Sequence, residues 1–310
     1  MKNFYALFAL VAAVSLSLAP ARADDTNVIG RTFSSPEEAV SAMQTAANNH
    51  DTNALADIFG PGFADIRTSD PVEGQNELKE FADSFSVSNY LDHVADDRCI
   101  LDTGTDRWPF PIPIVHGSTG WYFDTAAGKD ELINRRVGRD ELQAIKSMRV
   151  AAEAQREYAS ANHSGDEVLE FAQKLVSSPG KKDGLYWSPD IDGEISPLGP
   201  AFVAAQDEGY LKDVSSENSP QPFHGYFFKL LTRQGKHAPG DAYNYIINGH
   251  MIGGFAFVAW PAQYGESGVM TFIINQQGRV YQKDLGPDTG RLVKKMKAYD
   301  PDSSWTVTTD

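Results

Sequence analysis

The stretch Arg139–Tyr158, RDELQAIKSMRVAAEAQREY, decides how the rest of the chain is organised. Its apolar residues recur at helical intervals: Leu142, Ile145, Met148 and Ala152. The alanines between them favour a helix and let a sheet approach closely. Asp140 and Glu141 would lie near the start of this helix, where negative charge suits the helix dipole. The stretch therefore predicts a helix that needs a packed sheet for its stability.

The sheet is expected further along the chain, after a long polar loop over residues 160–223. Gly225–Thr232 has the composition of one strand, and Val269–Ile274 and Arg279–Lys283 have that of a hairpin. Asn248-Gly249 is the strongest short signal for a tight hairpin turn. Residues 129–310 are therefore predicted to form a helix packed on an antiparallel meander.

The residues before 129 predict a smaller α+β domain over 24–128. Ser35-Pro36-Glu37-Glu38 combines a capping residue, a proline at the first helical position and a capping-box glutamate. Further helices are expected at Ala54–Phe59 and Gln75–Phe85, followed by short strands. The fold class is therefore α+β, with two domains in 310 residues.

The first 23 residues have the pattern of a secretory signal peptide. Lys2 precedes an apolar run from Phe4 to Ala19, and Ala21-Arg22-Ala23 predicts cleavage after Ala23. No later run is apolar enough to span a membrane. No cysteine directly follows the predicted cleavage site to carry a lipid anchor. The protein is therefore expected to be periplasmic or secreted.

The charge balance excludes whole classes of partner. The chain carries a net charge of −15, and loss of Lys2 and Arg22 with the leader would make it about −17. Such a surface repels nucleic acid and anionic lipids, because phosphate binding relies on clustered Lys and Arg. Cys99 is the only cysteine, so no intramolecular disulfide can form, and a buried apolar role is expected for it.

One segment resembles a calcium-binding loop. In SANHSGDEVLEF, residues 160–171, the candidate ligands are Asn162, Ser164, Asp166 and Glu170. The template wants an acid in first place and a glutamate in twelfth place, where this chain has Ser160 and Phe171. The favoured interpretation is therefore a capped loop that starts a helix at Asp166, with bound calcium as the alternative. No other cofactor is expected.

Complete catalytic motifs are missing from the sequence. The seven histidines show no zinc spacing, and serine-hydrolase, Walker and dinucleotide fingerprints are absent. Asp92-His93, expected on a loop, is the best candidate for an acid–base pair. No other residue has more support as a catalytic group than this pair.

Three resemblances accompany these patterns. Pro36–Val40, Gly60–Phe63 and Gly120–Asp124 resemble the start of the cone-shaped fold of nuclear-transport-factor-2-like proteins, which implies a pocket. Ala144–Ser160, Gly225–Leu231 and Gly268–Asp284 resemble the globular head of type IV pilins. Most of the chain is similar to an exported bacterial family, domain of unknown function family 2950, through these stretches: Phe123–Gly128, Arg135–Arg139, Gln155–Ala159, Gly184–Trp187 and Gly268–Gly286.

Two functions remain open at this point. The first is a non-enzymatic binding or assembly module of the cell envelope with a protein partner, which the acidic surface and the pilin-like half favour. The second is a small-molecule-binding protein or enzyme that uses a pocket in the N-terminal domain, with Asp92 and His93 as acid–base groups. Neither the ligand nor the oligomeric state follows from the sequence.

Overall fold

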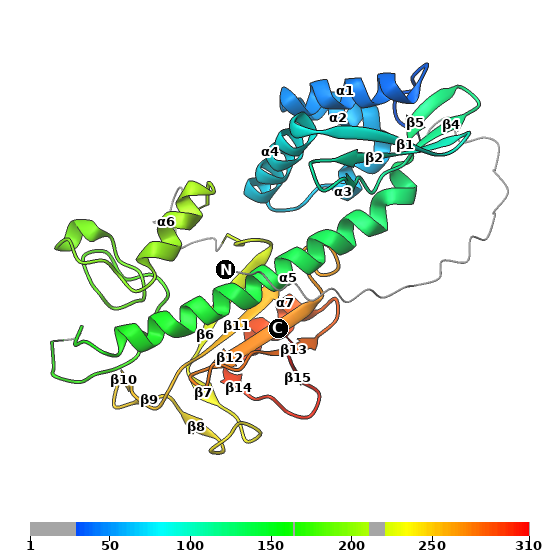
Figure 1. Ribbon diagram of the computed structural model, residues 1–310. Helices are drawn as coiled ribbons and strands as arrows, with labels where there is room; N and C mark the ends of the chain where they lie inside the picture. Colours follow the sequence, from blue (N-terminus) through cyan, green and yellow to red (C-terminus); the bar gives the residue numbers. More distant parts are fainter. Residues whose placement is uncertain (1–28, 164, 211–220, 310) are drawn as a thin grey trace.

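The computed structural model describes residues 29–163, 165–210 and 221–309 (Figure 1). It is a mixed α+β structure in which the long helix α5 (Thr125–Tyr158) runs from a first, smaller α+β unit to a second unit with its own antiparallel sheet. The expected fold class is confirmed. The predicted leader, with its cleavage site after Ala23, lies outside the described residues.

The first unit consists of helices packed on one antiparallel sheet. The helical segments are α1 (Pro36–Asn48), α2 (Thr52–Phe59), η1 (Gly60–Gly62), α3 (Phe63–Ile66) and α4 (Pro71–Val87). The strands are β1 (Asn89–Ala95), β2 (Arg98–Thr103), β3 (Trp108–Pro109), β4 (Ile114–Gly117) and β5 (Gly120–Phe123). The sheet order is β1-β2-β4-β5, with β3 paired to β2. Phe85, Cys99 and Ile114 lie in its apolar core, so the expected burial of Cys99 is confirmed.

The start of α1 is capped nearly as the sequence predicts. The Ser35 Oγ accepts a hydrogen bond from the Glu38 backbone N–H at 3.2 Å. The Glu38 carboxylate accepts from the N–H of Ser34, one residue earlier than the usual capping box. The local signal therefore located the helix start correctly.

The helix α5 begins fourteen residues before the predicted start at 139. Asp124 caps it by accepting from the Ala127 N–H at 3.1 Å. Gly128, which lowers helix propensity, lets the backbone of residue 112 approach, since a Cβ there would lie 2.6 Å from the Ile112 Cα. Asp140 is consequently in the middle of the helix and buried, so its predicted place at the helix start is wrong.

The second unit is built on a five-stranded antiparallel sheet with the order β15-β13-β12-β11-β6. Its strands are β6 (Tyr226–Leu231), β11 (Ala256–Pro261), β12 (Met270–Asn275), β13 (Tyr281–Asp284) and β15 (Thr306–Val307). The helix α5 packs on β12 and β11 through Ala144, Met148 and Ala152. Leu142 was predicted on this apolar face, but its side chain is 67% exposed.

Smaller elements complete the second unit. They are η2 (Pro189–Ile191), α6 (Gly199–Asp207), β7 (Arg233–Gln234), β8 (Tyr243–Asn244), β9 (Ile246–Ile247), β10 (His250–Met251), α7 (Thr289–Lys295) and β14 (Ala298–Tyr299). The predicted hairpin at Asn248-Gly249 is confirmed: it joins β9 to β10, with φ of 52° and 91° at the two residues. Positive φ at both positions is what a type I′ turn requires.

Helix α5 is also tied to the sheet by a polar contact. The Glu141 Oε1 accepts hydrogen bonds from the N–H groups of Val269 and Met270, both at 2.9 Å. Hydrogen bonds to a carboxylate are stronger than those between neutral groups. Glu141 therefore fixes the start of β12 against the helix.

The helix expected to start at Asp166 is absent. Residues 165–176 carry no helix and run as an irregular segment along the second unit, where the Phe171 N–H donates to the Met251 carbonyl at 2.9 Å. The Asp166 carboxylate accepts from the Val168 N–H, a local turn contact that competes with helix formation. In the loop that follows, the sequence predicts Leu185, Tyr186 and Trp187 as apolar anchors. Leu185 and Trp187 are buried, and Tyr186 is half-buried.

Within the described ranges, no helix combines the length and apolar character needed to cross a membrane. The division at 128/129 falls inside α5, which contributes Leu132 to the first core and Ala144 to the second. A two-domain division at that point therefore stays a prediction.

Candidate functional site

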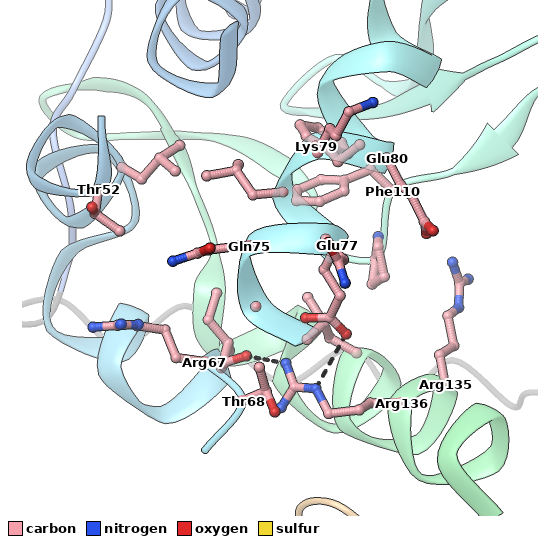
Figure 2. Close-up of a pocket in the computed structure, with 18 of the residues that line it drawn as sticks. Thr52, Arg67, Thr68, Gln75, Glu77, Lys79, Glu80, Phe110, Arg135 and Arg136 are labelled. Carbon is pink, nitrogen blue, oxygen red and sulfur yellow. Dashed lines mark hydrogen bonds and ion pairs between the residues drawn. The ribbon is translucent and has the colours of Figure 1, made fainter. Parts of the chain in front are cut away.

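A cavity of about 1200 Å³ opens in the first unit, lined by residues of α2, α3, α4, the β2–β4 region and α5 (Figure 2). Pockets that bury small molecules usually have volumes of several hundred Å³. The cavity is therefore large enough to hold a ligand of that class.

Aromatic and aliphatic side chains form much of its lining: Met43, Leu55, Phe59, Phe63, Ile66, Leu78, Phe81, Phe110 and Leu132. Several of these rings contact one another. The Phe81 and Phe110 centroids lie 5.2 Å apart, and Phe59 stacks on Phe63 at 5.9 Å. Such a lining favours the apolar part of a ligand, because burial of apolar surface is worth about 25 cal/mol per Å².

The charged residues of the lining are unbalanced toward cations. Five are basic, namely Arg67, Lys79, Arg135, Arg136 and Arg139, whereas three are acidic, namely Asp70, Glu77 and Glu80. This excess stands against the net charge of −15 of the whole chain. Three of the five cations pair with acids outside the lining, namely Lys79 with Asp83, Arg135 with Glu131 and Arg139 with Glu73, so much of this positive charge is balanced.

Arg136 is the most deeply buried of these cations, with 3% of its side chain exposed. Its Nη2 donates to the Ile66 carbonyl, and the Glu77 carboxylate lies 3.5 Å from its Nε. Neither Nε nor Nη1 has a hydrogen-bond partner within the described structure. A buried donor without a partner is costly, so Arg136 has unused capacity to bind an anion.

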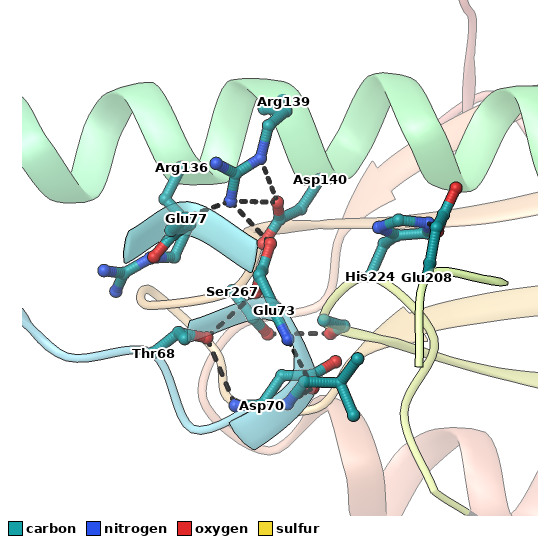
Figure 3. A network of polar contacts seen from close by, with 12 residues as sticks. Thr68, Asp70, Glu73, Glu77, Arg136, Arg139, Asp140, Glu208, His224 and Ser267 are labelled. Atoms are coloured by element: carbon teal, nitrogen blue, oxygen red, sulfur yellow. Dashed lines mark hydrogen bonds and ion pairs between the residues drawn. The ribbon is translucent and has the colours of Figure 1, made fainter. Parts of the chain in front are cut away.

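Behind Arg136 lies a cluster of charged side chains from α4 and α5 (Figure 3). The Arg139 Nη2 donates to the carboxylates of Glu73, Glu77 and Asp140, with 2.7 Å to Glu77 and 3.1 Å to Asp140. Burial, together with the neighbouring Glu73 carboxylate, raises the pKa of Asp140 to about 9. This shift favours the protonated form of Asp140, which would lower the number of negative charges that Arg139 must balance.

The cavity wall also contacts the segment that precedes the second sheet. Asp70 caps α4 by accepting from the N–H groups of Val72 and Glu73, and it accepts from the Tyr210 hydroxyl at 3.0 Å. In the same region the His224 Nε2 lies 2.9 Å from the Glu208 carboxylate. Burial lowers the pKa of His224, and Glu208 opposes that shift. The two units are thus joined through polar contacts at the edge of the cavity.

The sequence contains a signal for this site that its helical pattern alone did not reveal. Arg136 and Asp140 precede Ala144 and Met148 at intervals of four residues, so they continue the buried stripe of α5 toward its start. A charged residue on the buried stripe of a helix indicates a paired or functional group. Because the helix was expected to begin at 139, this continuation was missed.

The acid–base candidates of the sequence lie elsewhere. Asp92 and His93 are on β1, not on a loop, and their side chains are exposed. The His93 Nδ1 lies 3.2 Å from the Cys99 Sγ, and neither Asp92 nor His93 lines the cavity. Burial and the nearby acids Glu37 and Asp92 raise the pKa of the Cys99 thiol, which disfavours a thiolate nucleophile.

The calcium candidates are brought partly together. The His250 ring lies between two of them, with 3.4 Å from Nε2 to the Asp166 carboxylate and 3.3 Å from Nδ1 to Glu170. The Asn162 Oδ1 accepts from the Gly165 N–H at 2.8 Å, and Ser164 lies outside the described residues. In the described part of the chain, no group of three His, Cys, Asp or Glu side chains is arranged to hold a metal ion. Calcium binding stays a prediction.

Comparison with known proteins identifies a family without an assigned activity. No curated protein and no solved structure matches the chain significantly, so the likenesses to pilin heads and to nuclear-transport-factor-2-like cones are not confirmed. The family model described as "Protein of unknown function (DUF2950)" matches residues 30–308, which is nearly the whole chain. The protein therefore belongs to the DUF2950 family.

Proposed function

We propose that this protein is an exported bacterial binding protein that takes a small, largely apolar molecule into the cavity between α4 and α5. The observation that carries the proposal is the cavity itself: about 1200 Å³, lined by phenyl rings and aliphatic side chains with a few charged groups. Its cations are mainly arginines, which bind charge but do not exchange protons near neutral pH. This lining supports binding rather than catalysis.

An enzyme would need an acid–base group on the same wall. Asp70, Glu77, Glu80 and His50 line the cavity. Glu77 accepts from Arg139, and Asp70 accepts from two backbone N–H groups and Tyr210, whereas Glu80 and His50 are exposed. Carboxylates engaged in this way stabilise structure more readily than they move protons. The enzymatic alternative therefore has less support than binding.

Binding of a neutral apolar probe tests this proposal. We expect the purified protein to bind N-phenyl-1-naphthylamine with a rise in fluorescence, and Leu132→Asn to weaken that binding about fivefold. Leu132 lines the cavity, and a loss of about 1 kcal/mol follows from replacing part of its apolar contact.

Leu142→Asn is the matched control for this measurement. It makes the same change on the same helix, but Leu142 is exposed and does not line the cavity. The control is expected to bind the probe like the unaltered protein. Equal weakening by the two substitutions, or no saturable binding at all, would contradict the proposed function.

Export is proposed from the leader-like pattern that ends in Ala21-Arg22-Ala23. When the full chain is produced in a Gram-negative host, the protein recovered from the periplasm is expected to begin at Asp24. Intact-mass measurement checks this directly. Recovery of uncleaved protein in the cytoplasm alone would remove the support for a role in the envelope.

A further inference from the structure

We propose that the ligand of this cavity is an amphipathic carboxylate, whose head group binds the Arg136 guanidinium and whose apolar tail lies among the phenyl rings. The inference rests on the proposed binding function and specifies the class of ligand. It is carried by a buried arginine with unsatisfied donors on the wall of an apolar cavity (Figure 2).

The orientation of Arg136 is fixed before any ligand arrives. Its Nη2 is held by the Ile66 carbonyl and its Nε lies 3.5 Å from Glu77, whereas Nη1 has no hydrogen-bond partner. Nη1 has almost no accessible surface in this structure, so a lining side chain has to move before a ligand oxygen can accept from this unpaired donor. Because the guanidinium is already held in place, little side-chain entropy would be lost on binding.

An anion meets this donor better than a neutral oxygen does. A charge-assisted hydrogen bond is roughly twice as strong as one between neutral groups, and the surrounding apolar lining screens it little. Glu77 is shared between Arg136 and Arg139, and Glu73 gives Arg139 a second carboxylate, so the two cations and two carboxylates balance before a ligand binds. The raised pKa of Asp140 favours its neutral form, which keeps a further negative charge away from this pair.

The apolar tail of the ligand is inferred from the phenyl rings that line the cavity near Arg136. Ile66, whose carbonyl holds Arg136, lines the same cavity as Phe59, Phe63 and Phe81. A molecule with its charge at Nη1 therefore has an apolar surface beside it on which a hydrocarbon or aromatic body can be buried. A small hydrophilic anion such as inorganic phosphate would leave most of this surface unused.

Two probes with the same chain separate the head-group contribution from the apolar contribution. Dodecanoic acid and dodecanol are titrated at pH 8 as competitors of N-phenyl-1-naphthylamine. We expect the acid to bind about 10- to 100-fold more tightly than the alcohol, as charge-assisted hydrogen bonds imply. In Arg136→Met this preference should vanish, while the affinity for dodecanol changes by less than about twofold.

Two further variants keep the result interpretable. Arg291→Met removes one positive charge on α7, outside the cavity, and should keep the full preference for the acid. Arg136→Lys retains the charge but loses the planar arrangement of donors, and should reduce the preference at least about threefold. If Arg136→Met does not bind dodecanol either, the preference of Arg136→Lys for the acid over the alcohol decides whether Arg136 binds the head group.

The outcomes distinguish this inference from the function on which it rests. Equal affinities for the acid and the alcohol in the unaltered protein would overturn the carboxylate assignment and leave the binding function standing. A preference that survives in Arg136→Met, or is unchanged in Arg136→Lys, would overturn the role of Arg136. Failure of both probes and of N-phenyl-1-naphthylamine would overturn the proposed function itself.

Discussion

Replacing Arg139 by methionine is expected to lower the free energy of unfolding by about 3 kcal/mol. The substitution leaves the Glu73 carboxylate, which is 4% exposed, without its cationic partner, and it removes the hydrogen bonds from Arg139 to Glu77 and Asp140. Removing one partner of a buried ion pair typically costs about 3–5 kcal/mol. The value expected here is at the lower end, because the Arg139 side chain is 47% exposed and water can partly replace it. Urea denaturation at pH 7 measures the loss.

Arg291→Met provides the comparison for that loss. Arg291 also pairs with a carboxylate, that of Asp288, at 2.7 Å, but both side chains are largely exposed. Exposed pairs of this kind contribute little to stability, because water screens them. A loss of the same small size for Arg139→Met would show that the cluster behind the cavity is solvated and does not hold α4 to α5.

Replacing Asp140 by asparagine is expected to make the protein more stable at alkaline pH. The pKa of Asp140 is about 9 in the folded protein, above its ordinary value near 4, so the folded state binds a proton that the unfolded state has lost. Stability from this group is complete below about pH 4 and is lost as the pH rises toward 9, with a slope of up to about 1.4 kcal/mol per pH unit. Asparagine carries no such proton. Between pH 5 and pH 8 the variant should therefore gain about 4 kcal/mol relative to the unaltered protein.

The control for this pH dependence is Asp130→Asn, an exposed aspartate of the same helix. It should leave the slope of stability against pH unchanged, whereas Asp140→Asn should flatten it. Urea denaturation at several pH values from 5 to 8 measures both slopes. A parallel pH dependence in the Asp140→Asn variant and the unaltered protein would show that Asp140 is ionised in the fold.

The parts of the fold that were predictable are those set by neighbouring residues. The start of α1 follows from the Ser35 cap, and the β9–β10 turn follows from Asn248-Gly249. Each depends on a few adjacent side chains, and the turn depends also on positive φ. The strand β1 was missed because its side chains are mostly exposed and do not alternate between apolar and polar, and its strand conformation depends on pairing with β2. The first turns of α5 were missed because Gly128 and Gly138 weaken the helical pattern.

The candidate site was less accessible to sequence reasoning, because its contacts join distant segments. Arg139 meets Glu73 across 66 positions, and Tyr210 meets Asp70 across 140. Neither pairing leaves a short motif. The register of Arg136 and Asp140 on the buried stripe of α5 was the one local sign, and it becomes visible only when the helix is extended backward from Ala144.

The continuity of α5 connects the cavity wall to the second sheet through one helix. Arg136 on the cavity wall and Met148 beneath the second sheet are twelve residues apart on one uninterrupted helix, or about 18 Å along its axis. A helix is stiff along its length, since every turn is braced by backbone hydrogen bonds. A displacement of α5 at Arg136 would therefore be carried along the helix to the residues that pack against the second sheet.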